Sequence, residues 1–129
     1  MNIRIITYNI NGIRSAIKKG FLDWLKSNPA DIICLQEIKA QESDIKKELF
    51  EKSGYRPFIF SAERKGYSGV AILSRVKPDN IIYGHNNKQS DSEGRVLRAD
   101  LGNISVISAY FPSGTSGNIR QTYKYQWLD

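Results

Sequence analysis

Two polar side chains, Asn9 and Glu37, follow short apolar segments and have the chemistry of a cation site. If those segments are neighbouring parallel strands, both side chains project at the edge of the sheet where α/β proteins place their ligands. A carboxylate oxygen and an amide oxygen at that edge suit Mg²⁺, which takes few protein ligands and keeps its waters. The spacing also fits a solvated surface Glu37 and an Asn9 that only forms a turn, and spacing alone favours this second interpretation.

Other polar residues have weaker signals. Tyr110 precedes Phe111-Pro112 and fits either a rim aromatic or a hydrogen-bond donor to a phosphate. Arg95, in the segment Glu93-Gly94-Arg95, fits either a hairpin closure or an anion contact. His85 is in a polar stretch typical of a solvated loop, and Cys34 in an apolar run is typical of a small core residue. The chain has no Gly-x-x-x-x-Gly-Lys-Ser/Thr motif, which leaves phosphate-loop nucleotide binding without support.

The elements around Asn9 and Glu37 form a strand–helix–strand pattern. Residues 2–8 are rich in β-branched side chains, and residues 31–36 form a short apolar run, so both predict strands. Between them, apolar residues from Ile13 to Leu25 recur at spacings of three and four, which predicts a helix weakened by Gly20 and ended by Asn28-Pro29. Such a unit should make a right-handed crossover between parallel strands.

The rest of the chain alternates short strands with few helices. Ser43 would cap a short helix that runs to Ser53-Gly54, and residues 85–93 read as a loop. Residues 95–101 and 104–110 predict a hairpin that turns at Gly102-Asn103. The further expected elements are strands at 55–62, 70–73 and 78–83, a loop at 112–118, and a helix that opens at 119–128. This order predicts an α/β or α+β layered sandwich.

Composition narrows the class of protein. The 129 residues include 19 Lys and Arg and 13 Asp and Glu, and the formal net charge of +6 favours anionic partners. One cysteine excludes an internal disulfide framework and a cysteine-rich zinc module. No apolar run approaches the roughly 18 residues of a membrane span, so we expect no membrane association and a cytoplasmic location. The length suits a single core without an internal boundary.

Six motifs follow one another along the chain. The first two are Thr7-Tyr8-Asn9-Ile10-Asn11-Gly12-Ile13-Arg14 and Cys34-Leu35-Gln36-Glu37-Ile38-Lys39. The others are Gly66-Tyr67-Ser68-Gly69-Val70-Ala71-Ile72-Leu73-Ser74-Arg75, Glu93-Gly94-Arg95-Val96, Ala109-Tyr110-Phe111-Pro112, and Arg120-Gln121 with Trp127-Leu128-Asp129. In this order the motifs resemble the exonuclease III family of AP endonucleases, within the endonuclease/exonuclease/phosphatase superfamily.

The resemblance implies a four-layer α/β sandwich of the DNase I-like type, of which residues 1–129 would be about half, the N-terminal half. It also implies hydrolysis of DNA phosphodiesters with Mg²⁺ or Mn²⁺, by 3′–5′ exonuclease action and by incision of double-stranded DNA at abasic sites. The full-length protein would be a monomer.

By position in the motifs, the resemblance also implies site residues. Glu37 matches the metal-ligand carboxylate, with Asn9 and Asn11 beside the metal, and Tyr110 matches the tyrosine at the scissile phosphate. The side chains that match DNA-facing or active-site positions are Arg14, Lys39, Tyr67, Arg95 and Ser113.

Two family blocks do not occur in the 129 residues: a Gly-Asp-Phe-Asn block, whose Asp positions the attacking water, and a Ser-Asp-His block, whose His supports the phosphate. In-line hydrolysis needs an oriented nucleophile and support for developing charge. We therefore expect this chain alone to be inactive or nearly so. The alternative function is a non-catalytic, basic, self-associating half-domain, because half of a sandwich leaves an apolar sheet surface uncovered.

Overall fold

The computed structural model describes residues 2–112. Ser113, most of the loop predicted at 112–118 and the helix predicted at 119–128 lie outside the described residues. Within them the helical elements are α1 (Ile13–Lys18), α2 (Phe21–Ser27), the 3₁₀ turn η1 (Glu42–Asp44), α3 (Lys47–Lys52) and α4 (Lys88–Ser92). The strands are β1 (Ile5–Asn9), β2 (Ile32–Gln36), β3 (Arg56–Phe60), β4 (Val70–Ser74), β5 (Asn80–Tyr83), β6 (Val96–Leu101) and β7 (Ile104–Ala109).

The first sheet, sheet A, has the strand order β1-β2-β4-β3. β1 and β2 are parallel, with Asn9 opposite Gln36, so the predicted pairing of these two strands is confirmed. β4 runs antiparallel to both of its neighbours. The parallel pair brings the carboxyl ends of β1 and β2 to one edge, which places Asn9 beside the residue that follows β2.

The crossover between β1 and β2 differs from the single helix expected from the apolar spacing. It contains two helices, α1 and α2, separated at Gly20, whose φ of 104° is left-handed. Glycine adopts this conformation without the steric cost that other residues have, so the chain turns there while both helices keep their apolar faces on the sheet. The apolar period was read correctly, but the glycine breaks the helix rather than only weakening it.

Two further local predictions were wrong. Ser43 does not cap a helix: it lies inside η1, which is closed by a reciprocal pair of hydrogen bonds between Gln41 and Asp44, and α3 begins only at Lys47. The segment 85–93 is not all loop, because α4 forms there with the Asn87 side chain accepting from the Ser90 amide at 2.9 Å. In both places a side-chain cap of a polar segment was assigned to the wrong residue or missed.

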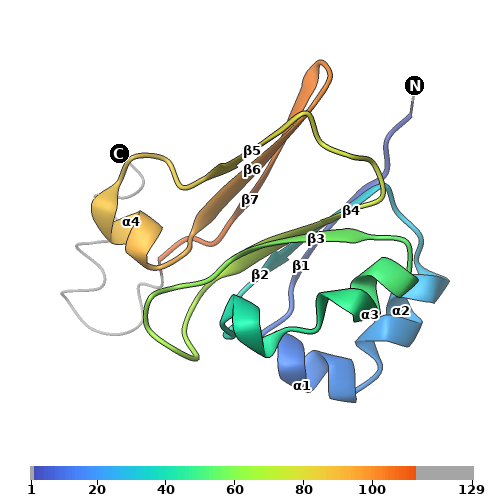
Figure 1. Ribbon diagram of the computed structural model, residues 1–129, viewed down its shortest axis with the longest axis horizontal. Helices are drawn as coiled ribbons and strands as arrows, with labels where there is room; N and C mark the ends of the chain where they lie inside the picture. Colours follow the sequence, from blue (N-terminus) through green and yellow to red (C-terminus); the bar gives the residue numbers. More distant parts are fainter. Residues whose placement is uncertain (1, 113–129) are drawn as a thin grey trace.

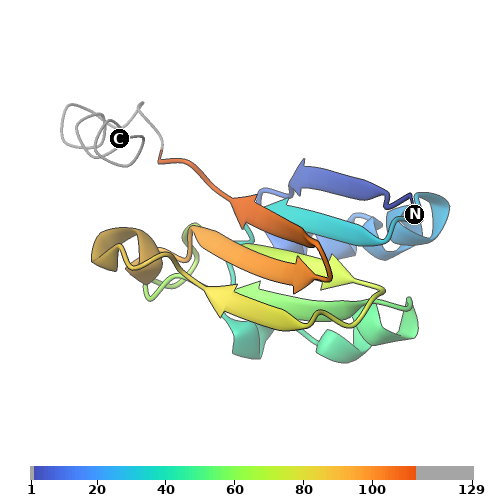
Figure 2. The same cartoon turned by 90° about the horizontal axis from the view of Figure 1, so that it is seen from above.

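The second sheet, sheet B, has the order β5-β6-β7, all antiparallel. Leu101 pairs with Ile104 across Gly102-Asn103, which confirms the predicted hairpin. Sheet B lies face to face with sheet A, and α1, α2 and α3 cover the opposite face of sheet A (Figures 1 and 2). The described residues therefore form three layers, a mixed α/β arrangement.

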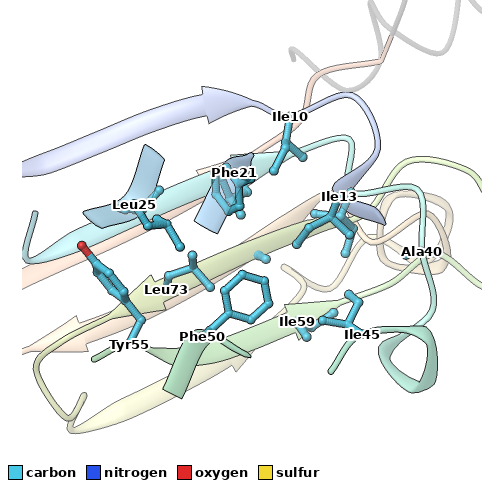
Figure 3. Packing of buried hydrophobic residues seen from close by; sticks show 14 of the residues in the cluster. Ile10, Ile13, Phe21, Leu25, Ala40, Ile45, Phe50, Tyr55, Ile59 and Leu73 are labelled. Carbon is cyan, nitrogen blue, oxygen red and sulfur yellow. The ribbon is translucent and has the colours of Figure 1, made fainter. Parts of the chain in front are cut away.

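Alternate residues of β2 belong to two separate hydrophobic cores. Ile33 and Leu35 pack toward the helices, in a cluster with Phe21, Phe50 and Leu73 (Figure 3). Ile32 and Cys34 instead join the apolar cluster that lies between the two sheets and includes Leu97, Ala99 and Val106. Because successive side chains of a strand point to opposite faces, a strand buried on both faces reads as the continuous apolar run seen at 31–36.

Two apolar surfaces of the described residues stay open. Ile107 on the outer face of sheet B is 55% exposed, and Ile82, two strands away in the same row, is 37% exposed. α4 lies at one end of sheet B rather than over this face (Figure 1). On sheet A, β1 is an edge strand, and its Ile5 is 45% exposed. None of the described helices is long and apolar enough to cross a membrane.

Candidate active site

The predicted site residues within the described chain gather at one end of the two sheets. β1, β2 and β7 all end there, as their arrowheads in Figure 2 show. Asn9 is the last residue of β1, Glu37 follows β2, and Tyr110 follows β7. Glu37 and Tyr110, 73 positions apart in the sequence, come together because sheet B stacks on sheet A with β7 near β2.

Glu37 is the centre of a polar network on sheet A. The Asn9 side-chain amide donates to Glu37 Oε1 at 3.0 Å, and Lys39 Nζ lies 3.5 Å from Glu37 Oε2. Lys39 also donates to Asn11 Oδ1 at 2.7 Å, while Asn9 Oδ1 accepts from the Asn11 backbone N–H at 3.1 Å. The four residues thus hold one another in place, with the carboxylate 21% exposed.

The two loops that carry this network are joined through their backbones. Gly12 N–H donates to the Glu37 carbonyl at 2.8 Å, and Ile13 N–H donates to the Ile38 carbonyl at 2.9 Å. Asn11, Glu37 and Lys39 all have positive φ, between 46° and 54°. Left-handed backbone at non-glycine residues costs free energy and persists where the surroundings enforce it, most often at functional sites.

Tyr110 connects this network to sheet B. Its hydroxyl donates to Glu37, and burial together with the negative charge and hydrogen bond of Glu37 raises the pKa of the Tyr110 phenol above its usual range. The nearby Arg95 charge acts in the opposite direction. The hydroxyl therefore stays protonated at neutral pH and remains a hydrogen-bond donor.

Arg95 is buried, with a side chain that is 1% exposed. Its Nε donates to Glu93 Oε1 at 2.7 Å, its Nη1 to the Tyr110 carbonyl at 3.0 Å, and its Nη2 to the Tyr67 hydroxyl at 3.1 Å. The guanidinium carbon also lies 5.0 Å from the centre of the Tyr110 ring. The structure therefore places Arg95 beneath the two tyrosines rather than at the surface.

Arg14 is the remaining predicted site residue among those described, and it is exposed. Its Nη2 lies 3.4 Å from the Lys39 carbonyl, so it borders the Glu37 network on the α1 side. Ser113, also predicted to face DNA, lies outside the described residues.

Sequence reasoning missed two supporting residues. One is Glu93, which pairs with Arg95; the signal available in the sequence is an acidic residue two positions before an arginine, with a glycine between them. Gln36 joins the sheets: its Nε2 donates to Thr7 Oγ1 at 3.1 Å and to Ser108 Oγ at 3.2 Å. Nothing local in the sequence connects Gln36 with Ser108, because they meet only when the sheets stack.

The donor set fits a hard divalent cation with few protein ligands. Glu37 and Asn11 present oxygens that the Lys39 ammonium already bridges, so this position suits a positive charge. Both ends of the Asn9 amide are engaged within the network. No group of three or more His, Cys, Asp or Glu residues lies close enough to hold a metal ion within residues 2–112. A cation here would therefore rely on Glu37, neighbouring amide oxygens and its own waters, the pattern of Mg²⁺.

A carboxylate and a tyrosine hydroxyl thus meet at one end of two stacked sheets, of which sheet A is mixed and sheet B is antiparallel. The sequence profile of the Endonuclease/Exonuclease/phosphatase family matches residues 6–129, and the chain belongs to this family.

Similar proteins support this family assignment. The chain is 34% identical over 128 residues to the DNA repair nuclease APEX1 of Danio rerio, covering 98% of this chain and 41% of that protein. It is 37% identical over 126 residues to an exodeoxyribonuclease of Bacillus subtilis, and the match covers 97% of this chain and 49% of that protein. The chain thus spans less than half the length of these two relatives.

Solved structures show the same partial match. An AP endonuclease from Archaeoglobus fulgidus superposes with a TM-score of 0.87 and 34% identity, covering 98% of this chain and 48% of that one. The Neisseria 3′ phosphatase NExo, bound to a product DNA hairpin, superposes with a TM-score of 0.87 and 28% identity. This match covers 98% of this chain and 49% of that one. The fold is therefore the mixed α/β fold of about half of an AP endonuclease structure, as expected from the motifs.

Proposed function

We propose that this chain is the part of a DNA-repair phosphodiesterase that holds the divalent cation, in a protein acting on double-stranded DNA at abasic sites and 3′ ends. One observation carries the proposal: Glu37, Asn11 and Tyr110 lie in the segments that follow β2, β1 and β7, and they come together at one end of the two sheets. There the Tyr110 hydroxyl donates to Glu37, and Lys39 donates to Asn11 Oδ1 while lying 3.5 Å from Glu37 Oε2. The family and its two relatives, a DNA repair nuclease and an exodeoxyribonuclease, support DNA as the substrate class.

Each residue has a task in this function. Glu37 and Asn11 would hold Mg²⁺ or Mn²⁺, with Asn9 orienting the carboxylate through its 3.0 Å hydrogen bond. When bound, the cation would neutralise charge that develops on the phosphate. Tyr110, protonated at neutral pH, would donate to a phosphate oxygen, as charge-stabilising donors do in other hydrolases.

The basic side chains would position the DNA. Arg14 and Lys39 are both on the Glu37 side of the site, and the chain carries a net charge of +6. Cations near the site would bind phosphates without reading sequence and would make affinity depend on salt. Tyr67 is the aromatic residue of the β3–β4 loop that lies next to Arg95.

Hydrolysis also needs a group that orients the attacking water. The Gly-Asp-Phe-Asn and Ser-Asp-His blocks are not among the 129 residues, so we expect the 129-residue polypeptide by itself to bind weakly and not to cleave.

Incision of a supercoiled plasmid that carries abasic sites tests this function in the full-length gene product. We expect Mg²⁺-dependent nicking that EDTA stops, and a loss of at least about a hundredfold in kcat/KM for Glu37→Gln, which removes the carboxylate charge at the cation. Glu48→Gln, an exposed carboxylate on α3, is the matched control and should act as wild type. Wild-type protein that leaves abasic DNA intact in the presence of Mg²⁺ or Mn²⁺ would overturn the proposal.

A second candidate function is a non-catalytic basic module that self-associates. The open apolar residues on the outer face of sheet B and on β1 favour it, since exposed apolar surface drives association. Two copies could cover each other about a two-fold axis. Light scattering and thermal unfolding of the 129-residue polypeptide test this candidate function. A monomer with a cooperative thermal transition would contradict self-association.

A further inference from the structure

Arg95 carries a permanent charge in a position closed to water. Its side chain is 1% exposed, and an arginine stays protonated at any physiological pH. Burying a charge is costly unless it is paired and hydrogen-bonded, so the groups around the guanidinium decide whether this position is tolerated. The acidic partner is Glu93, whose Oε1 lies 2.7 Å from Arg95 Nε.

The Arg95 guanidinium joins three separate segments of the chain. One nitrogen faces Glu93 in the turn before β6, a second donates to the carbonyl of Tyr110 after β7, and the third donates to the hydroxyl of Tyr67 in the β3–β4 loop. A planar fork of donors fixes directions as well as distances, which a flexible ammonium does not. The orientation of the fork therefore determines the spacing of the two tyrosines.

Glu93 is itself held by the backbone. Its N–H donates to the Ser90 carbonyl at 3.1 Å at the end of α4, and the preceding Ser92 carbonyl accepts from Glu63 N–H at 2.8 Å. At Gly94 an added Cβ would lie 2.5 Å from the Phe60 carbonyl oxygen, so this turn is pressed against the end of β3. The backbone that carries Glu93 is thus fixed against the end of β3, while Arg95 leads into sheet B.

We propose that Glu93 is a positioning residue: it orients the Arg95 guanidinium, which in turn sets Tyr67 and Tyr110 at the candidate active site. Arg95 then acts through the tyrosines and does not itself contact DNA. This inference rests on the proposed function, because it assigns Tyr110 its task at the phosphate. It changes the role of Arg95, which motif resemblance alone places among DNA-facing residues.

Kinetics of the full-length gene product on an abasic-site duplex test the proposal. Glu93→Gln keeps an oxygen acceptor for Arg95 Nε but removes the charge that orients it. We expect kcat to fall at least about tenfold with KM little changed, since small misplacements of a group at the reacting centre lower the rate. Asp100→Asn is the matched control. Asp100 forms an ion pair with Arg98, two residues away in the sequence, and the distance from Arg98 Nε to Asp100 Oδ1 is also 2.7 Å, but this pair lies on the outer face of sheet B.

Arg95→Lys separates positioning from DNA contact. If Arg95 positions the tyrosines, the lysine lowers kcat, and adding Glu93→Gln lowers it little further, because both changes disrupt the same group. If Arg95 contacts a phosphate, the lysine instead keeps kcat, and the effect appears in KM and its salt dependence. That second result would overturn the proposal.

A readout without DNA or metal keeps the test independent of the proposed activity. The ¹³Cζ resonances of Tyr67 and Tyr110 at neutral pH should both shift in Glu93→Gln and stay in place in Asp100→Asn. Unchanged tyrosine resonances with wild-type kcat would overturn the positioning role while leaving the proposed function intact. If Glu93→Gln does not fold, the same resonances in Arg95→Lys decide.

Discussion

Lys39 shows at the scale of one residue why the Glu37 site suits a cation. Its ammonium donates to Asn11 Oδ1 at 2.7 Å and lies 3.5 Å from Glu37 Oε2, so it bridges the two oxygens that would hold a metal ion. The Lys39 side chain is 40% exposed, so in the proposed function its ammonium would move toward solvent or toward a DNA phosphate when a divalent cation binds. In the proposed function, this one side chain would connect the cation site with the DNA-facing surface.

Cys34 provides a prediction at the same scale. It is 2% exposed between the two sheets, and burial raises the pKa of its thiol to about 11. Because the thiolate is the reactive form, only about one thiol in a thousand is ionised at pH 8. We expect a thiol reagent to label Cys34 orders of magnitude more slowly in native than in guanidinium-unfolded protein. Rapid labelling of native protein at pH 8 would show that the sheets do not close over Cys34.

At the scale of elements, tight backbone approach fixes the turn that carries Glu93 and Arg95. Gly94 and Gly102 have similar left-handed φ values, 56° and 61°, but differ in their surroundings. A Cβ at Gly94 would meet the backbone of Phe60 and Ser61 at 2.5 and 2.8 Å, whereas a Cβ at Gly102 would meet nothing within 4 Å. The two positions therefore separate the cost of conformation from the cost of a collision.

The matched pair Gly94→Ala and Gly102→Ala measures that difference. Gly102→Ala should cost about 1 kcal/mol of unfolding free energy, the cost of a left-handed alanine. Gly94→Ala should cost at least about 2 kcal/mol more, because backbone must move to admit the methyl group. Denaturant unfolding of both variants gives the comparison. Equal losses would mean that the turn is not pressed against β3.

At the scale of the whole molecule, the uncovered apolar surfaces of the described residues are the features on which the second candidate function, self-association, depends. Along the row Ile82-Arg98-Ile107, the outer face of sheet B presents two apolar side chains around one charge. β1 adds exposed apolar surface beside an unpaired strand edge within the described residues. Open edges and apolar faces are the features through which sheet proteins associate.

Ile107→Lys tests whether this face drives association of the 129-residue polypeptide. A charge at the β7 end of the row, beside Arg98, should lower the apparent mass in light scattering toward that of a monomer. Val76→Lys is the control, because Val76 is similarly exposed at 48% but lies in the loop after β4. If both lysine variants keep the mass of the wild type, association does not use the outer face of sheet B.

The sequence by itself determined the elements whose signals are local. Each of three local signals was sufficient to predict its element: the apolar run at 31–36, the β-branched run before Asn9 and the Gly102-Asn103 turn. Burial on two faces, strand preference and turn chemistry all act over a few residues, so they can be recognised locally. The ordered motifs also identified the family and most of the residues that meet at the site.

Only the tertiary structure decided how those residues are used. That Arg95 is buried beneath Tyr67 and Tyr110, and that Gln36 meets Ser108, depends on how sheet B stacks on sheet A. The break at Gly20 likewise depends on packing, because a glycine inside a helical period is tolerated until both flanking helices must face the same sheet. Such long-range contacts leave no periodic signal in the sequence, since their partners are brought together only when the layers close.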